Sequence, residues 1–264
     1  DNKRAYKMNA AHRMQGVGTL CPRTPSASGV VSHPKKRASA AATRPPSTGS
    51  PSSGSDTVIL FDVMDTIVRD PFFDKMPAYF SLSFEELLQQ KHPTAWIDFE
   101  SARITEDEFF SIFFKDRREI DREDFVKRVL LDHYEILPGM DGLLESLRGQ
   151  GYDIRAFSNY PVWYEYVEQA CGLSRYLDWE FVSCKGVLAA GCYRKPAIES
   201  FEVVWAAVQG GDSHGDVSQA RKRVLFVDDR PANVEAAVRV GMEGILFQGA
   251  EALRDELRAR GIDC

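Results

Sequence analysis

Short apolar runs alternate with helical patterns from residue 57 to the C-terminus, and this alternation restricts the chain to few folds. The first run, Thr57–Phe61 (TVILF), is rich in β-branched residues, as is typical of a buried parallel strand. Similar runs follow at Asp153–Phe157, Phe181–Ser183, Arg223–Val227 and Gly244–Phe247. Helical patterns lie between them, including Met140–Gly151 and Ala197–Val208. The sequence therefore predicts an α/β fold, a Rossmann-like open parallel sheet with helices on both faces.

Residues 72–137 interrupt this alternation. The segments that begin at Ser83 and at Thr105 match the capping-box pattern of a helix start, and no strand-like run accompanies them. The region holds thirteen of the 29 aromatic residues in a quarter of the chain, which suits the core of a small helical bundle. We expect a helical cap at 72–137, inserted after the first strand of an α/β core that comprises residues 57–71 and 138–264.

Residues 1–56 have a different composition. From Cys21 to Ser55 the chain is dominated by Ser, Ala, Pro, Thr, Gly and Arg without hydrophobic periodicity, which predicts a disordered basic tail. A segment rich in Arg and Ser and poor in acids fits an organelle transit peptide followed by a linker. The alternatives are a nonspecific low-complexity tail and translation from a misplaced start. Because the chain begins with Asp1 and not Met, we expect its natural N-terminus to lie upstream.

Charge and composition exclude several classes of function. The formal net charge of the chain is −6. Residues 1–55 carry a net charge of +8, so the remaining residues carry −14. An acidic body argues against nucleic acid as a partner, because phosphate binding depends on Lys and Arg. No apolar run approaches the 18 residues of a membrane span, so we expect no membrane partner. Five cysteines at neither zinc nor disulfide-framework spacing predict free thiols in a reducing compartment.

Polar side chains stand at four strand ends or in the loops that follow them. Each of these residues alone could end a turn or cap a helix. The carboxyl ends of parallel strands, however, meet at one edge of the sheet, where ligands gather. We therefore expect one shared site that contains Asp62, Ser158, Asn159, Lys195, Asp228 and Asp229.

The segments FDVMDT, FSNYP, YRKP and VDDRPAN resemble the four motifs of the haloacid dehalogenase-like hydrolase superfamily, across residues 57–264. The resemblance implies that Asp62 is a nucleophile that takes a phosphoryl group from a substrate and is regenerated by water. It also implies a Mg²⁺ ion held by Asp62, the backbone carbonyl of Met64 and Asp229, with Asp228 acting through water.

Two further roles follow from the same resemblance. Ser158 and the backbone N–H of Asn159 would hold phosphoryl oxygens. Lys195 would supply the fixed positive charge that lets two anions, carboxylate and phosphate, approach each other. The implied partner is a small phosphate ester.

Met64 departs from the pattern of the superfamily. Most of its phosphatases have a second aspartate at this position, which protonates the leaving oxygen. Either Asp65 takes that role or the leaving alkoxide is stabilised in another way, and Asp65 could instead only cap the turn after the strand. Dehalogenases of the same fold also lack the second aspartate and need no metal, so a metal-free haloacid dehalogenase is the alternative enzyme. The pair Asp228-Asp229 would repel an anionic haloacid and favours the phosphatase. A non-catalytic flavin- or protein-binding module is the third hypothesis.

Four longer segments resemble the plant and algal chloroplast flavin mononucleotide (FMN) hydrolases, Met64 included: FDVMDTIVRDPFF, KHPTAWIDFE, FSNYPVWYEYVE and VDDRPANVEAA. This likeness implies hydrolysis of FMN to riboflavin, or of 5-amino-6-(5-phosphoribitylamino)uracil earlier in riboflavin synthesis. It favours a chloroplast destination, with the cytoplasm as the alternative. Phe72, Phe73, Trp96 and Trp163 could offer flat surfaces to a heteroaromatic ring, although aromatic residues at helical spacing are more often core. Nothing in the sequence indicates an oligomeric state.

Overall fold

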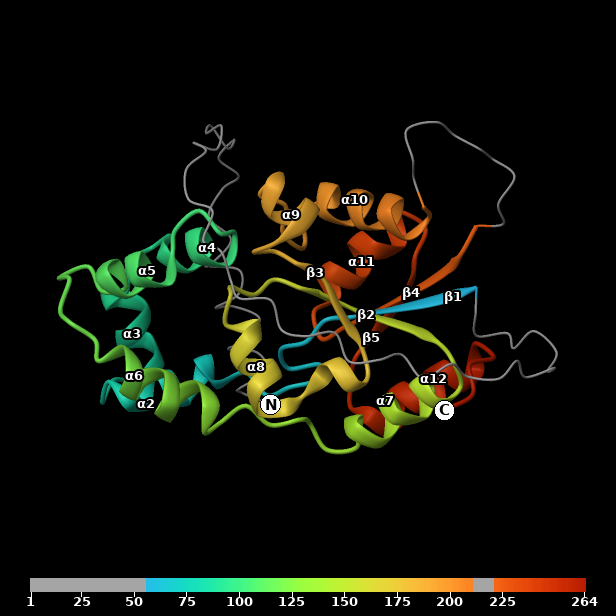
Figure 1. The fold of residues 1–264 in the computed structure, drawn as a ribbon, viewed down its shortest axis with the longest axis horizontal. Coiled ribbons are helices and arrows are strands. Elements are labelled where there is room, and N and C mark those ends of the chain that lie inside the picture. The colour runs from blue at the N-terminus through green and yellow to red at the C-terminus, as the bar shows by residue number, and fades with distance from the viewer. Residues whose placement is uncertain (1–55, 211–220) are drawn as a thin grey trace, which may run out of the picture.

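A five-stranded, all-parallel sheet forms the centre of the molecule, with strand order β3-β2-β1-β4-β5 (Figure 1). The computed structural model describes residues 56–210 and 221–264, so the expected tail lies outside the described residues except for Asp56. The fold confirms the predicted α/β class. The strands are β1 (Thr57–Phe61), β2 (Asp153–Ser158), β3 (Asp178–Val182), β4 (Arg223–Asp228) and β5 (Glu243–Leu246).

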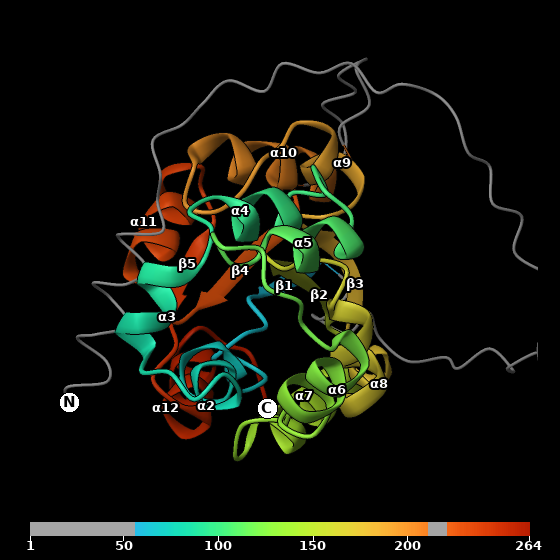
Figure 2. The same ribbon diagram turned by 90° about the vertical axis from the view of Figure 1, so that its left-hand side faces the viewer.

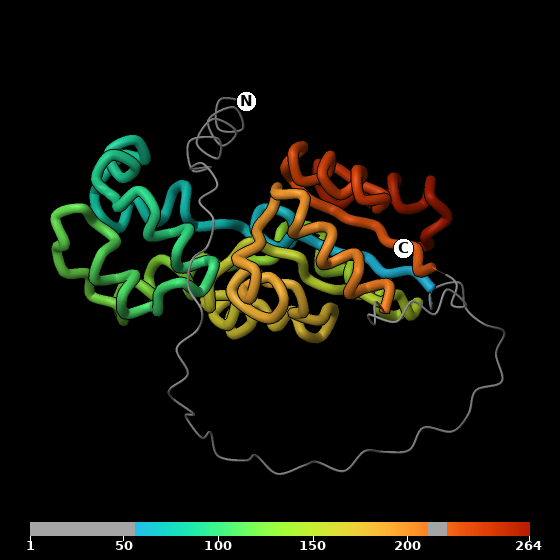
Figure 3. The backbone as a smooth tube through the Cα atoms, turned by 90° about the horizontal axis from the view of Figure 1, so that it is seen from above, coloured from blue at the N-terminus to red at the C-terminus, as the bar shows by residue number. Residues whose placement is uncertain are grey.

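Strand β1 is buried on both faces, and its side chains divide between two hydrophobic clusters. Ile59 and Phe61 pack on one side of the sheet, whereas Val58 and Leu60 pack on the other, as the two-residue period of a strand requires. The first face is covered by α7 (Met140–Gly149) and α12 (Ala250–Ala259), and the second by α9 (Gly186–Ala190), α10 (Ile198–Val208) and α11 (Pro231–Arg239) (Figures 1 and 3).

Strand β3 begins at Asp178, three residues before the predicted start. It lies at the edge of the sheet, and its first three residues are exposed or half-buried while Phe181 and Val182 are buried. A search for continuous apolar runs finds only the buried half of such a strand, because an edge strand keeps polar side chains on its open side.

All named elements between β1 and α7 are helical, and they lie beyond the carboxyl ends of the strands (Figures 1 and 2). Both predicted capping boxes form, with Ser83 Oγ accepting from the Glu86 N–H and Thr105 Oγ1 from the Glu108 N–H, each at 3.2 Å. The elements are η1 (Pro71–Phe73), α2 (Lys75–Tyr79), α3 (Phe84–Gln90), α4 (Ala95–Glu100), α5 (Glu106–Ile112), α6 (Arg122–Phe125) and the π-helical η2 (Val126–Leu131).

Trp163 belongs to the sheet domain but packs inside the cap. It directly precedes α8 (Tyr164–Cys171), it is fully buried, and its Nε1 donates a 2.6 Å hydrogen bond to Glu106 Oε1 of the cap. Its ring centroid lies 5.2–6.0 Å from those of Trp96, Phe99, Phe109, Phe110 and Phe125. This placement corrects the prediction that Trp163 offers a face to a substrate, because the indole ring has no exposed face left.

Within the described part of the chain, no helix is long and apolar enough to cross a membrane.

Candidate active site

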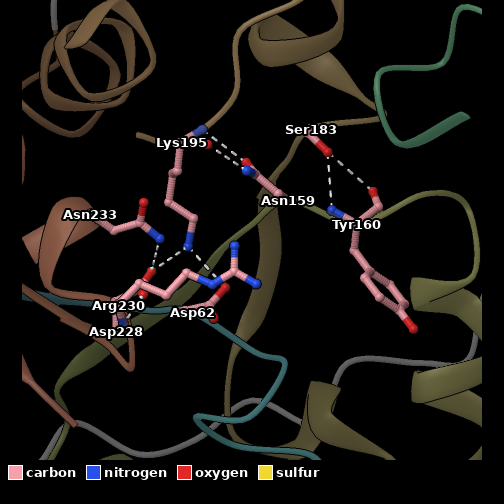
Figure 4. Close-up of polar contacts among 8 residues, drawn as sticks. All are labelled: Asp62, Asn159, Tyr160, Ser183, Lys195, Asp228, Arg230 and Asn233. Carbon is pink, nitrogen blue, oxygen red and sulfur yellow. Dashed lines mark hydrogen bonds and ion pairs between the residues drawn. The ribbon is translucent and has the colours of Figure 1, made fainter. Parts of the chain in front are cut away.

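Lys195 lies at the centre of a polar cluster at the carboxyl ends of β1, β2 and β4 (Figure 4). Its Nζ donates to Asp62 Oδ1 at 2.8 Å and to Asp228 Oδ2 at 2.7 Å, and its side chain is 1% exposed. Burial lowers the pKa of Lys195, but Asp228 and Asp62 together raise it above its ordinary value. The ammonium group is therefore charged, and it joins two carboxylates that come from different strands.

Asp228 is fully buried and held by three donors. Besides Lys195, Asn233 Nδ2 donates to its Oδ2 at 2.9 Å and the backbone N–H of Arg230 donates to its Oδ1 at 2.8 Å. Asn233 reaches this position because α11 begins directly after β4. With both oxygens engaged by the protein, Asp228 is fixed in one orientation.

A reciprocal pair of hydrogen bonds fixes the loop that carries Lys195. Asn159 Nδ2 donates to the Lys195 carbonyl at 2.8 Å, and the Lys195 N–H donates to Asn159 Oδ1 at 2.9 Å. The neighbouring Ser158 Oγ is buried and has no hydrogen-bond partner among the described residues. A buried hydroxyl without a partner is rare, and an oxygen of a bound ligand is one group that would satisfy it.

Three carboxylates form a cluster whose geometry suits a divalent cation. One oxygen each of Asp62, Asp228 and Asp229 lies within 4.8 Å of the other two. Burial raises the pKa of Asp62 to about 6, with Lys195 opposing the rise and Asp228 adding to it. Burial and the charge of Asp228 raise the pKa of Asp229 to about 8. Oxygen ligands of this kind are those that Mg²⁺ prefers, and the ion would relieve the repulsion among them.

The cavity above this cluster has walls from both the core and the cap. Met64 and Asp65 line it beside Asp62, and Phe72 and Trp96 line it from the cap, with ring centroids 5.6 Å apart. Phe73, the third cap residue that we predicted to offer a surface to a ring, lines the cavity as well.

Asp65 has a left-handed backbone conformation with φ of 59°, a region that aspartate tolerates better than most residues. Its Oδ1 accepts a hydrogen bond from the Asp70 N–H at 3.2 Å. Asp65 therefore stabilises the turn after β1 and also stands on the cavity wall.

The sequence analysis did not assign roles to two arginines and one glutamate of the cavity wall. Glu100, at the C-terminus of α4, is 2% exposed and accepts from Arg194 Nε at 2.6 Å, an ion pair between cap and core. Burial raises the pKa of Glu100, while Arg194 opposes the rise. Arg230, the residue after Asp229, also lines the cavity. Arg194 belongs to the motif segment YRKP and Arg230 to VDDRPAN, and this membership is the sequence signal that could have identified them as site residues.

Comparison with known proteins identifies relatives of this chain. A family model described as haloacid dehalogenase-like hydrolase matches residues 57–241. The chain is 42% identical over 207 residues to flavin mononucleotide hydrolase 1 of Arabidopsis thaliana, named as a chloroplast protein, with 78% of each chain covered.

Solved structures of the same fold are more distant in sequence. A predicted haloacid dehalogenase-like hydrolase of Porphyromonas gingivalis has a TM-score of 0.54 at 23% identity, covering 76% of this chain and 97% of its own. A family enzyme of Bacteroides thetaiotaomicron, solved with magnesium and inorganic phosphate, has a TM-score of 0.54 at 18% identity, covering 73% and 94%. At these identities the likeness shows the fold alone. The family match and the Arabidopsis relative together show that this chain belongs to the haloacid dehalogenase-like hydrolase family.

Proposed function

We propose that the protein is a Mg²⁺-dependent phosphomonoester hydrolase whose substrate is a ribityl phosphate, either FMN or 5-amino-6-(5-phosphoribitylamino)uracil. The family and the Arabidopsis relative make the chain a phosphatase. The metal, the covalent intermediate and the substrate are what the proposal adds. A plastid destination is part of it, on the strength of the relative's name.

The contact of Lys195 with both Asp62 and Asp228 is the observation that carries the proposal. A carboxylate attacks a phosphate dianion only if positive charge offsets their repulsion, and the ammonium group provides part of it in a buried setting. Asp62, Asp229 and the Met64 carbonyl would hold Mg²⁺, with Asp228 acting through water. The ion would supply the remaining positive charge near the phosphoryl group.

The chain's own groups then have defined roles. Asp62, which lines the cavity, would form the bond to phosphorus. Ser158 Oγ and the Asn159 N–H would hold phosphoryl oxygens, and a bound oxygen would give the buried serine hydroxyl a partner. Asp65 is the candidate proton donor that the sequence offers.

The aromatic part of the wall supports a flavin or pyrimidine substrate. Phe72, Phe73 and Trp96 line the same cavity as Asp62, so a planar ring attached to the phosphate through a ribityl chain would meet aromatic side chains. The Arabidopsis relative, an FMN hydrolase by name, supports the same substrate class.

The first experiment tests the nucleophile. Wild-type protein, Asp62→Asn and the control Asp255→Asn, an exposed residue of α12, are mixed with [³²P]FMN and Mg²⁺, quenched in acid and analysed for protein-bound label. Wild type and the control should carry acid-stable label and release phosphate, and Asp62→Asn should do neither. EDTA should stop phosphate release and Mg²⁺ should restore it. Turnover by Asp62→Asn, or turnover indifferent to chelation, would contradict the mechanism.

The second experiment tests the substrate. The kcat/KM values of FMN, the ribityl-pyrimidine phosphate and a set of sugar phosphates are measured side by side. One of the first two should exceed every sugar phosphate by at least tenfold, since only they carry a ring for the aromatic wall. Equal values would remove the ribityl assignment and leave a general phosphatase. Halide release from 2-haloacids, which the three-carboxylate cluster argues against, is measured in parallel.

A further inference from the structure

Met64 lines the cavity, but its thioether side chain has no proton to give. When the bond between phosphorus and the ester oxygen breaks, negative charge develops on that oxygen. Unless a donor protonates it, a fixed positive charge has to stabilise it. The search for the group that stabilises this charge rests on the proposed phosphatase function.

Three cationic side chains line the cavity, and two of them are committed to other partners. Lys195 is 1% exposed, with its ammonium group bound to Asp62 and Asp228. The guanidinium group of Arg194 is paired with Glu100, which is buried in the cap.

Arg230 is different from both. Its side chain has no ion pair within 4 Å and no hydrogen bond to any residue of 56–210 or 221–264, and the residue as a whole is exposed. Yet Figure 4 shows it extended from the end of β4 toward Asp62 and Lys195. The carboxylates of Asp229, Asp62 and Asp228 raise the pKa of its guanidinium group. Arg230 is thus a charged group directed toward the reacting carboxylate, with its hydrogen-bond donors available.

We propose that Arg230 binds the ester oxygen of the substrate and stabilises the charge that develops there, in place of the proton donor that Met64 does not provide. In this step an oxygen of Asp62 forms a bond to phosphorus, and the bond from phosphorus to the ester oxygen breaks. The electron pair stays on the ester oxygen, which is held by the guanidinium group and takes a proton from water to leave as an alcohol. Five N–H donors in a planar fork suit this task better than one ammonium group.

The test compares two leaving groups. FMN releases an alkoxide that needs strong stabilisation, whereas 4-nitrophenyl phosphate releases a phenolate that is stable without it. Arg230→Met should lower kcat for FMN by roughly 10²- to 10³-fold, the usual effect of removing one preorganised donor. For 4-nitrophenyl phosphate the loss should be less than tenfold. Arg230→Lys should recover part of the FMN activity, and added guanidinium ion should rescue Arg230→Met with FMN.

Arg239→Met is the matched control, because Arg239 is exposed at the C-terminal end of α11, the helix that follows Arg230, and does not line the cavity. Its kinetics with both esters should equal those of wild type. The melting temperature of Arg230→Met is measured to verify that it folds. Equal losses with the two esters would overturn the proposal, since Arg230 would then act on substrate binding or on the metal site. No loss with either ester would overturn it as well.

Asp65→Asn tests the rival hypothesis that Asp65 donates a proton to the ester oxygen. If Asp65→Asn shows the loss that depends on the leaving group while Arg230→Met does not, Asp65 is the proton donor and the proposal fails. Failure of the phosphatase function itself would look different, because wild-type protein would then release phosphate from neither ester.

Discussion

Replacing Lys195 with methionine removes the buried positive charge and keeps most of the apolar stem. The ammonium group sits 2.8 Å from Asp62 and 2.7 Å from Asp228, with the rings of Phe157 and Phe226 at 5.2 and 5.1 Å. Removing one partner of a buried ion pair typically destabilises a protein by about 3–5 kcal/mol, because the other charge stays buried without compensation. We therefore expect Lys195→Met to lose about 3–5 kcal/mol of unfolding free energy at pH 8 in EDTA. For a protein of this size that loss lowers the melting temperature by roughly 6–20 °C.

The loss should depend on pH in a definite direction. Burial already raises the pKa of Asp62 to about 6 with Lys195 present, and Lys195 lowers that pKa, so the substitution raises it further. A carboxyl whose pKa is higher in the folded than in the unfolded state destabilises the protein fully above the folded-state pKa, and this destabilisation decreases as the pH falls from that pKa toward the unfolded-state value. The gap between wild type and Lys195→Met should therefore shrink steadily from pH 8 to pH 5.

Urea unfolding followed by circular dichroism at four pH values in EDTA measures both effects. Lys127→Met, at an exposed position of η2, is the control and should stay within about 0.5 kcal/mol of wild type. The double variant Lys195→Met/Asp228→Asn should recover part of the loss, since it removes one of the two stranded charges. A loss under about 1 kcal/mol at pH 8, or a gap that does not narrow in acid, would refute the buried-charge argument.

Three further perturbations test other parts of the structure. In metal-free protein the pKa of Asp229 is about 8 and that of Asp62 about 6, so protons compete with Mg²⁺; calorimetry should show proton release on Mg²⁺ binding and weaker binding at pH 6 than at pH 8. Trp163→Ala should lower the unfolding free energy in urea by about 3–5 kcal/mol, since it empties a fully buried site; a loss under 1 kcal/mol would contradict this. Gly244→Ala would place a Cβ 2.7 Å from Val234 Cγ1, and should destabilise by about 1–3 kcal/mol in the same assay by pushing α11 away from β5.

Local patterns explain why much of the sheet could be predicted. Strand β1 lies in the centre of the sheet and is buried on both faces, so its apolar run is continuous and visible in the sequence. The predicted helix that ends in a glycine is α7, and Gly151 just beyond it has φ of 85°, which a residue without Cβ adopts readily. The edge strand β3 was only half recognised, because its first residues are exposed and polar.

The candidate site, like the sheet, has one part that the sequence predicts and one part that it does not. Asp62, Lys195, Asp228 and Asp229 converge as the strand ends predict, because parallel topology alone brings those ends to one edge. The ion pair of Glu100 with Arg194 could not be predicted, since it depends on how the cap docks on the core and joins residues 94 positions apart. The burial of Trp163 has the same origin.

The indole of Trp163 also limits how this enzyme could be redesigned. A simple route to a new substrate would be to exchange the inserted cap as a module. Here the core contributes Trp163 to the interior of the cap. A foreign cap would therefore need a cavity that fits the indole ring and a hydrogen-bond acceptor for its N–H. Chimeras built at the ends of the insert would break this contact. Those that carry the segment around Trp163 together with the cap would preserve it.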